Sequence, residues 1–116
     1  MSLRCTCRFV SCLSLLGAGS AFASWTRNGN LISGNPSNPP SLAAAPDGSG
    51  GALLAWIQPG AGSQDDVYVQ RIGPDGNPLW GMGGIAVCDT TGPQADPAVV
   101  SDGSGGAIVV WSDGRD

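Results

Sequence analysis

An internal repeat of 55 residues constrains this chain more than any other feature of its sequence. The segment from Pro46 to Trp56, Pro-Asp-Gly-Ser-Gly-Gly-Ala-Leu-Leu-Ala-Trp, returns from Ser101 to Trp111 as Ser-Asp-Gly-Ser-Gly-Gly-Ala-Ile-Val-Val-Trp. Trp25 and Trp80 are separated by the same offset, so all four tryptophans fall into two pairs. A sequence of this kind predicts tandem copies of one structural unit.

Each unit has the pattern of short strands joined by tight turns. Asp-Gly-Ser-Gly predicts a turn in which the aspartate bonds its own backbone and glycine takes positive φ. The chain has no Lys and no Glu, which are strong helix formers, while Gly and Pro number 19 and 9. The predicted strands are 41–45, 51–57 and 66–72, a fourth extended stretch that begins at 79–80 and ends at 85–87, and then 98–100 and 106–111.

Four antiparallel strands in about 50 residues, repeated in tandem, are typical of a β-propeller blade. The runs 51–57 and 106–111 are apolar throughout, which predicts strands buried on both faces. We therefore expect an all-β fold of propeller blades, an incomplete propeller, with a β-sandwich as the alternative. The residues expected to hold the repeat structure are Trp25, Asp47, Gly48, Gly51, Trp56, Trp80, Asp102, Gly103, Gly106 and Trp111.

The first 23 residues have the pattern of a secretory signal peptide. Arg4 and Arg8 give a basic start, an apolar run follows, and Ala21-Phe22-Ala23 provides a small-x-small cleavage site. The sequence therefore predicts export, with a mature region of 24–116, and localisation outside the cell or at its surface. The apolar run is too short to predict a membrane span.

The mature region would carry three arginines and nine aspartates, a net charge of −6. Such a surface repels the phosphates of nucleic acids, so we expect no nucleic-acid partner. One cysteine, Cys88, would remain after cleavage, and its setting in Ile-Ala-Val-Cys predicts a small buried apolar side chain.

The motifs Asp-Gly-Ser-Gly-Gly-Ala-(Ile/Leu)-x-x-Trp, Asp-Val-Tyr-Val-Gln-Arg, Gly-Asn-Pro-Leu-Trp and Gly-Ile-Ala-Val-Cys occur between Trp25 and Arg115. In these motifs the chain resembles a class of large secreted bacterial tandem-repeat proteins. The resemblance implies stacked units that form β-propellers, in some members ahead of a C-terminal sorting or anchoring domain. It implies no particular activity.

The expected organisation contains fewer than two units. A partial closing strand occupies 24–33, repeat one about 41–88, and a truncated repeat two about 97–116. Repeat units bury their faces only against neighbours. We therefore expect this chain to be the N-terminal fragment of a longer protein, whose further blades would be its partners. A complete small protein that closes a ring by oligomerisation is the alternative.

The sequence offers little for catalysis. It contains no His and no Lys to act as the base of a nucleophilic triad, and one mature cysteine does not make a zinc site. Asp65 and Asp66 are adjacent, so in a strand they would point to opposite faces and could not cooperate as a carboxylate pair. We expect no catalytic residue and no cofactor within this chain.

Calcium is the one ion for which candidate ligands exist, Asp47 and Asp102, each in a repeated turn. Calcium needs six to eight oxygen ligands, whereas each turn offers one carboxylate, which favours a structural role for both residues. The tryptophans Trp56 and Trp111 are candidates for stacking on sugars, although their equal spacing favours packing between blades.

Two functions agree with these observations. The first is a secreted or surface-displayed binding or adhesion scaffold that presents loops to a glycan or a protein. The alternative is a secreted hydrolase, glycosidase-like, whose catalytic residues lie outside this chain.

Overall fold

The computed structural model describes residues 26–33, 41–60 and 64–115. The described residues form six β-strands and no helix, and every strand pairing is antiparallel, which confirms the all-β prediction. The strands are β1 (Leu42–Pro46), β2 (Ala52–Pro59), β3 (Asp65–Ile72), β4 (Ile85–Cys88), β5 (Gln94–Ser101) and β6 (Ala107–Asp113).

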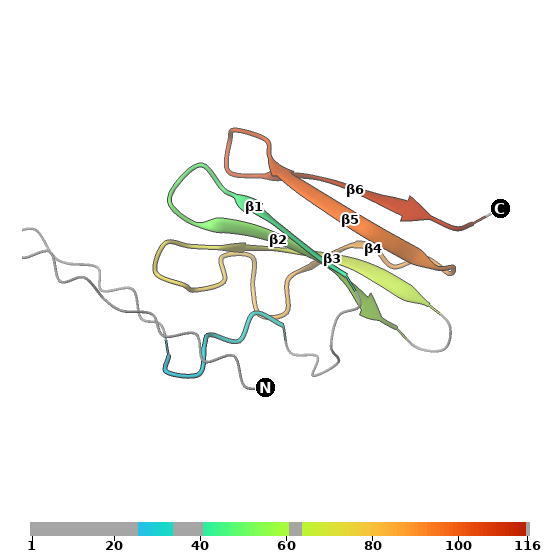
Figure 1. Ribbon diagram of the computed structural model, residues 1–116, viewed down its shortest axis with the longest axis horizontal. Helices are drawn as coiled ribbons and strands as arrows, with labels where there is room; N and C mark the ends of the chain where they lie inside the picture. Colours follow the sequence, from blue (N-terminus) through green and yellow to red (C-terminus); the bar gives the residue numbers. More distant parts are fainter. Residues whose placement is uncertain (1–25, 34–40, 61–63, 116) are drawn as a thin grey trace, which may run out of the picture.

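The strands form two open sheets (Figure 1). Strands β1 to β4 pair in the order of the sequence, and β5 and β6 form a hairpin. Within each sheet, strands that are neighbours in the chain are therefore neighbours in space. The predicted strands differ from the observed ones mainly at their ends, where β2, β5 and β6 extend further than the apolar runs alone indicate.

The fourth extended stretch is divided in two. Pro78 forms an isolated bridge with Ile72, the chain then turns through glycines, and β4 pairs with β3 from Ile85 onward. Gly84 has a φ of +78°, and a Cβ on it would lie 2.6 Å from the carbonyl oxygen of Val69 and 2.8 Å from the ring of Trp56. Glycine is therefore required where the backbone crosses the tryptophan.

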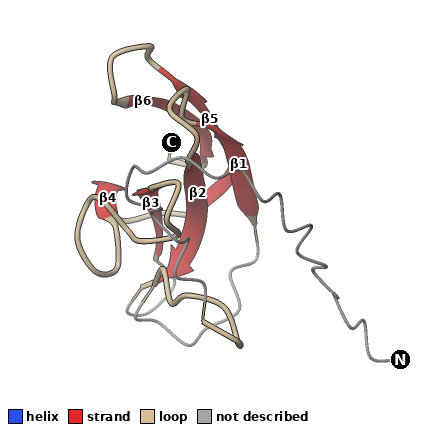
Figure 2. Ribbon diagram, turned by 90° about the vertical axis from the view of Figure 1, so that its left-hand side faces the viewer, coloured by secondary structure: helices blue, strands red, loops and turns tan. Residues whose placement is uncertain are grey.

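The hairpin of β5 and β6 packs on one face of the four-stranded sheet, with β5 next to β1 and β2 (Figure 2). Two apolar clusters lie between the sheets. The first has Leu53, Ala55, Val69 and Val99 at its centre, and the second has Ile57, Val67 and Cys88, against which Val109 and Trp111 pack. The core of the protein is thus the contact between the two sheets.

The two sheets present different faces to this contact. The four-stranded sheet contributes the face of β2 that carries Leu53 and Ala55, whereas the hairpin contributes the face of β6 that carries Val109 and Trp111. By the 55-residue offset, Val109 and Trp111 correspond to Leu54 and Trp56, which lie on the opposite face of β2. The hairpin and the first sheet therefore meet through non-equivalent faces of the repeat, which is a head-to-tail arrangement.

Burial on both faces was predicted for both apolar runs, and it holds only for the first. In β2, Leu53 is fully buried and Trp56, on the other face, is 4% exposed. In β6, Ile108 and Val110 are 55% and 59% exposed. The prediction was wrong for β6 because, among the described residues, nothing packs on the face of the hairpin that points away from the first sheet.

Residues 26–33 belong to the segment predicted as a closing strand. They begin with a turn in which the Gly29 amide donates to the carbonyl oxygen of Thr26, and none of them lies in a strand. The side-chain amide of Asn30 donates to the carbonyl oxygen of Gly76 at 2.9 Å, which joins this segment to the turn after β3. Residues 24 and 25, including Trp25, lie outside the described residues, as does the predicted signal peptide.

Candidate functional site

The Asp-Gly-Ser-Gly-Gly turns that precede β2 and β6 lie at the same end of the molecule (Figure 1). In the first, Oδ1 of Asp47 accepts hydrogen bonds from the amides of Ser49 at 2.7 Å and Gly51 at 2.8 Å. In the second, Oδ1 of Asp102 accepts from the amides two and four residues later at 2.7 and 2.9 Å. Both turns thus have the aspartate cap that the sequence predicts.

The glycines of these turns adopt matching conformations. Gly48 and Gly103 have φ values of +82° and +81°. Gly51 lies against β3, where a Cβ would collide with the carbonyl oxygen of Ile72, and Gly106 lies against the carboxylate of Asp102. In each turn, the first glycine (Gly48 or Gly103) provides the left-handed backbone. The last glycine (Gly51 or Gly106) allows the turn to approach neighbouring groups closely.

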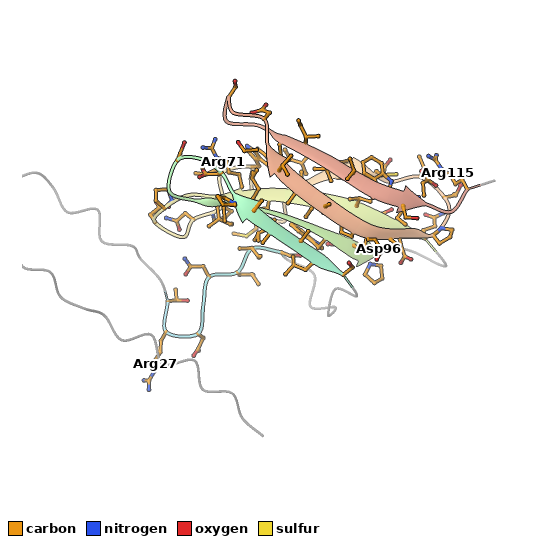
Figure 3. All side chains as sticks on the ribbon, turned by 45° about the horizontal axis from the view of Figure 1, so that its top comes forward. Arg27, Arg71, Asp96 and Arg115 are labelled. Atoms are coloured by element: carbon orange, nitrogen blue, oxygen red, sulfur yellow. The ribbon has the colours of Figure 1, made fainter. Side chains whose placement is uncertain are left out.

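Arg71 connects the two turns (Figure 3). From the inner face of β3, its Nε donates to Oδ2 of Asp47 at 2.9 Å, and its Nη1 donates to the carbonyl oxygen of Gly105 at 2.9 Å. The hydroxyl of Ser101 adds a third contact, since it donates to the carbonyl oxygen of Asp47 at 3.3 Å. One guanidinium thereby joins β3, the first turn and the second turn.

The environments of the two aspartates differ. Asp47 is 5% exposed, and both of its carboxylate oxygens accept hydrogen bonds. Asp102 is exposed, and its bonds within the described residues are made by Oδ1. The amide of Ser49, together with Arg71 and the second turn amide, holds the pKa of Asp47 below its ordinary value. The amides of Ser104 and Gly106 lower the pKa of Asp102 in the same way.

These lowered values predict acid sensitivity. A carboxyl whose pKa is lower in the folded than in the unfolded state stabilises the fold above its ordinary pKa, here 3.8. That contribution is lost as the pH falls through the lower folded value. We therefore expect the free energy of unfolding, measured by urea titration from neutral pH to about pH 2, to fall below about pH 4. The isosteric variant D47N should show a shallower dependence, and an unchanged slope would contradict the assignment.

The turns leave little room for calcium beside Asp47. Its two carboxylate oxygens already accept from two amides and a guanidinium, which places a positive charge where a cation would bind. Across the described residues, no group of three or more His, Cys, Asp or Glu side chains is placed to hold a metal ion. Calcium at Asp47 or Asp102 stays a prediction from the sequence.

The tryptophans have different surroundings. Trp56 is buried and stacks on Tyr68, with ring centroids 5.9 Å apart. Trp80 packs against the first apolar cluster, and Trp111 is half-buried against the second. The burial of Trp56 leaves no ring face for a sugar.

Cys88 and the adjacent aspartates take places that agree with their sequence context. Cys88 is buried beside Ile57 and Val67, as predicted, and its Sγ lies 3.4 Å from the hydroxyl of Thr90. Asp65 and Asp66 begin β3, where they pair with consecutive residues at the end of β2. Their side chains therefore point to opposite faces of the sheet.

Sequence reasoning missed two residues that hold this end of the molecule together. Arg71 ends the motif Asp-Val-Tyr-Val-Gln-Arg, which predicts a strand and no contact with the turns. Gln70 is fully buried, where its Oε1 accepts from the amides of Arg71 and Trp80 and its Nε2 donates to the carbonyl oxygen of Gly81. The available signal was an adjacent amide and cation between the Val-Tyr-Val run of β3 and its last residue, Ile72.

Comparison with known proteins gave no match among protein-family models, curated proteins or solved structures. A search of the described residues for a helix long and apolar enough to cross a membrane found none.

Proposed function

We propose that this chain is a secreted or surface-displayed repeat protein of β-propeller-like organisation, which acts as a binding or adhesion scaffold for a glycan or a protein. The observation that carries the proposal is the head-to-tail packing of the hairpin on the first sheet. Successive propeller blades contact one another through opposite faces, whereas the two sheets of a sandwich bury one face each and leave the other in solvent.

A scaffold role is further supported by how the carboxylates are used. Asp47 and Asp102 cap the two related turns, Asp75 accepts from the amide and side chain of Asn77, and Asp113 is paired with Arg115. Each of these carboxylates thus stabilises a local turn or strand end. Residues used in this way maintain the shape of loops, which is what a presenting scaffold requires.

The end of the molecule that carries the turns is the surface we assign to ligand binding. It gathers the two Asp-Gly-Ser-Gly-Gly turns and the turn after β3, and Arg71 fixes two of them relative to each other (Figure 3). The exposed groups there include Ser49, Asn77 and Ser104. Hydroxyl and amide groups on rigid turns suit the hydroxyl-rich surface of a glycan.

The proposal is tested by applying the purified exported chain to a glycan array and a panel of extracellular proteins. We expect saturable binding that is lost with Ser104→Arg and kept with Thr91→Arg, a matched exposed residue in the loop between β4 and β5. Absence of binding to every probe, or equal loss with both variants, would refute the assignment. Cleavage of a bound glycan would identify a hydrolase instead.

Export is tested separately. We expect the protein recovered outside the cell to begin at Ser24, because cleavage follows the small residues Ala21 and Ala23. Intact-mass spectrometry of the secreted product measures this, and Ala23→Arg should block cleavage while leaving the basic start and apolar run in place. A secreted product that retains Met1 would contradict the prediction.

A further inference from the structure

The edge of β6 that faces away from β5 is open among the described residues, because the hairpin is a sheet of two strands (Figure 1). In the first sheet, β2 takes the place that β6 has in the hairpin, and the corresponding edge of β2 pairs with β3 along its whole length. An open edge exposes a row of unpaired amide and carbonyl groups, which is a template for another strand.

The face beside that edge is apolar. Val100, Ile108 and Val110 are 54%, 55% and 59% exposed. The residues at the positions of Ile108 and Val110 in β2, Leu53 and Ala55, are fully buried. The hairpin therefore carries an apolar surface whose counterpart in the same molecule is covered.

Two side chains of the hairpin lack the β3 contacts that their counterparts make. Asp47 receives the guanidinium of Arg71 on Oδ2, while Oδ2 of Asp102 receives no side-chain donor from the described residues. Trp56 stacks on Tyr68 from the neighbouring strand, whereas no strand of the described residues lies beside Trp111 on that edge. In the first sheet, both partners come from one strand: Tyr68 and Arg71 lie three residues apart on β3.

We propose that the open edge of β6 is an acceptor site for an extended strand of the β3 type, Val-Tyr-Val-Gln-Arg. In the register of β2 and β3, Leu53 lies opposite Arg71 and Trp56 opposite Tyr68. The bound strand takes the same register on β6, so that its arginine lies opposite Ile108 and donates to Oδ2 of Asp102. Its tyrosine then stacks on Trp111, and backbone hydrogen bonds along the edge supply the remaining affinity.

This site does not depend on the ligand-binding role proposed above, because it runs along the edge of β6 and shares only Asp102 with the turns. Its occupant is defined by chemistry: an extended segment with alternating apolar residues, one aromatic ring and one arginine. A charge-assisted bond to the aspartate gives the site direction and register, since a strand shifted by one residue would turn its arginine to the other face.

The test uses a fluorescent synthetic peptide of residues 64–73, titrated with the exported chain and followed by anisotropy. We expect saturable binding that Asp102→Asn weakens about tenfold or more, as expected for loss of a charge-assisted hydrogen bond. Asparagine keeps an oxygen for the two turn amides, so the turn itself is preserved. The matched control Asp75→Asn, in the turn after β3, should leave the affinity unchanged.

A peptide that carries R71Q separates binding from any effect on the folded chain. We expect it to bind the unchanged protein about tenfold more weakly, and to lose little further affinity to the D102N variant, because both changes remove one interaction. Absence of saturable binding would overturn the proposal. So would equal affinity for the D102N variant, which would show that the peptide exchanges with β3 and does not add to β6.

Discussion

Replacing Trp56 with alanine is expected to lower the free energy of unfolding by about 3–5 kcal/mol, the usual cost of truncating a buried aromatic side chain. Trp56 is 4% exposed, stacks on Tyr68 and lies under the backbone at Gly84. Alanine would leave a cavity that this backbone cannot readily fill, because Gln70 holds the preceding residues, Trp80 and Gly81, by hydrogen bonds. Urea denaturation of the mature chain, followed by circular dichroism at fixed protein concentration, measures the loss.

Trp111 is the matched control, because it is the fifth residue of β6 as Trp56 is of β2. It is half-buried and lies on an open strand, so we expect Trp111→Ala to cost clearly less than Trp56→Ala. If Trp56→Ala abolishes folding, Trp56→Phe keeps a ring against Tyr68 and should still give a measurable transition. A loss below about 1 kcal/mol for Trp56→Ala would be inconsistent with a buried structural residue.

The strands and turns were predictable because their causes are local. Asp47 and Asp102 bond amides two and four residues away, so the turn is encoded within five residues. The apolar run around Trp56 and the alternation around Val67 similarly indicate extended structure without reference to the rest of the chain. The described strands follow these patterns closely, with differences at the ends where side-chain character is mixed.

The contacts that join the sheets were not predictable, because they depend on which faces meet. The repeat gives β2 and β6 nearly the same residues, yet Leu53 is buried and Ile108 is exposed. The position of Arg71 between the two turns follows from the packing of the hairpin, which brings Gly105 within 2.9 Å of its guanidinium. Local sequence carries no information on such a distance.

The break in the fourth extended stretch is an intermediate case. Three glycines among residues 81–84 indicate a turn, but the residue that stabilises it, Gln70, lies on β3. A fully buried glutamine is stable only where its amide meets backbone donors and acceptors, and this requirement becomes visible once both segments are in place. The residues that sequence reasoning missed are therefore those whose partners are distant in the chain.

The second large effect compares two positions that the repeat makes equivalent, Leu53 and Ile108. Leu53 is fully buried beneath the hairpin, where Val99 packs in the same cluster. We expect Leu53→Ala to cost about 2–5 kcal/mol, the sum of lost apolar transfer and a residual cavity. Ile108 is 55% exposed, so Ile108→Ala should change the free energy of unfolding by no more than about 0.5–1 kcal/mol.

A milder pair keeps the comparison measurable if Leu53→Ala prevents folding. Ile57 is 1% exposed, and Ile57→Val should cost about 0.5–1.5 kcal/mol, whereas Ile108→Val should be close to neutral. If Ile57→Val and Ile108→Val lowered the free energy of unfolding equally, the outer face of the hairpin would be covered in solution. In that case the loss of unfolding free energy for Ile108→Val should rise with protein concentration, because burial of Ile108 would come from association. The loss for Ile57→Val should not change with concentration, because Ile57 is buried within one chain.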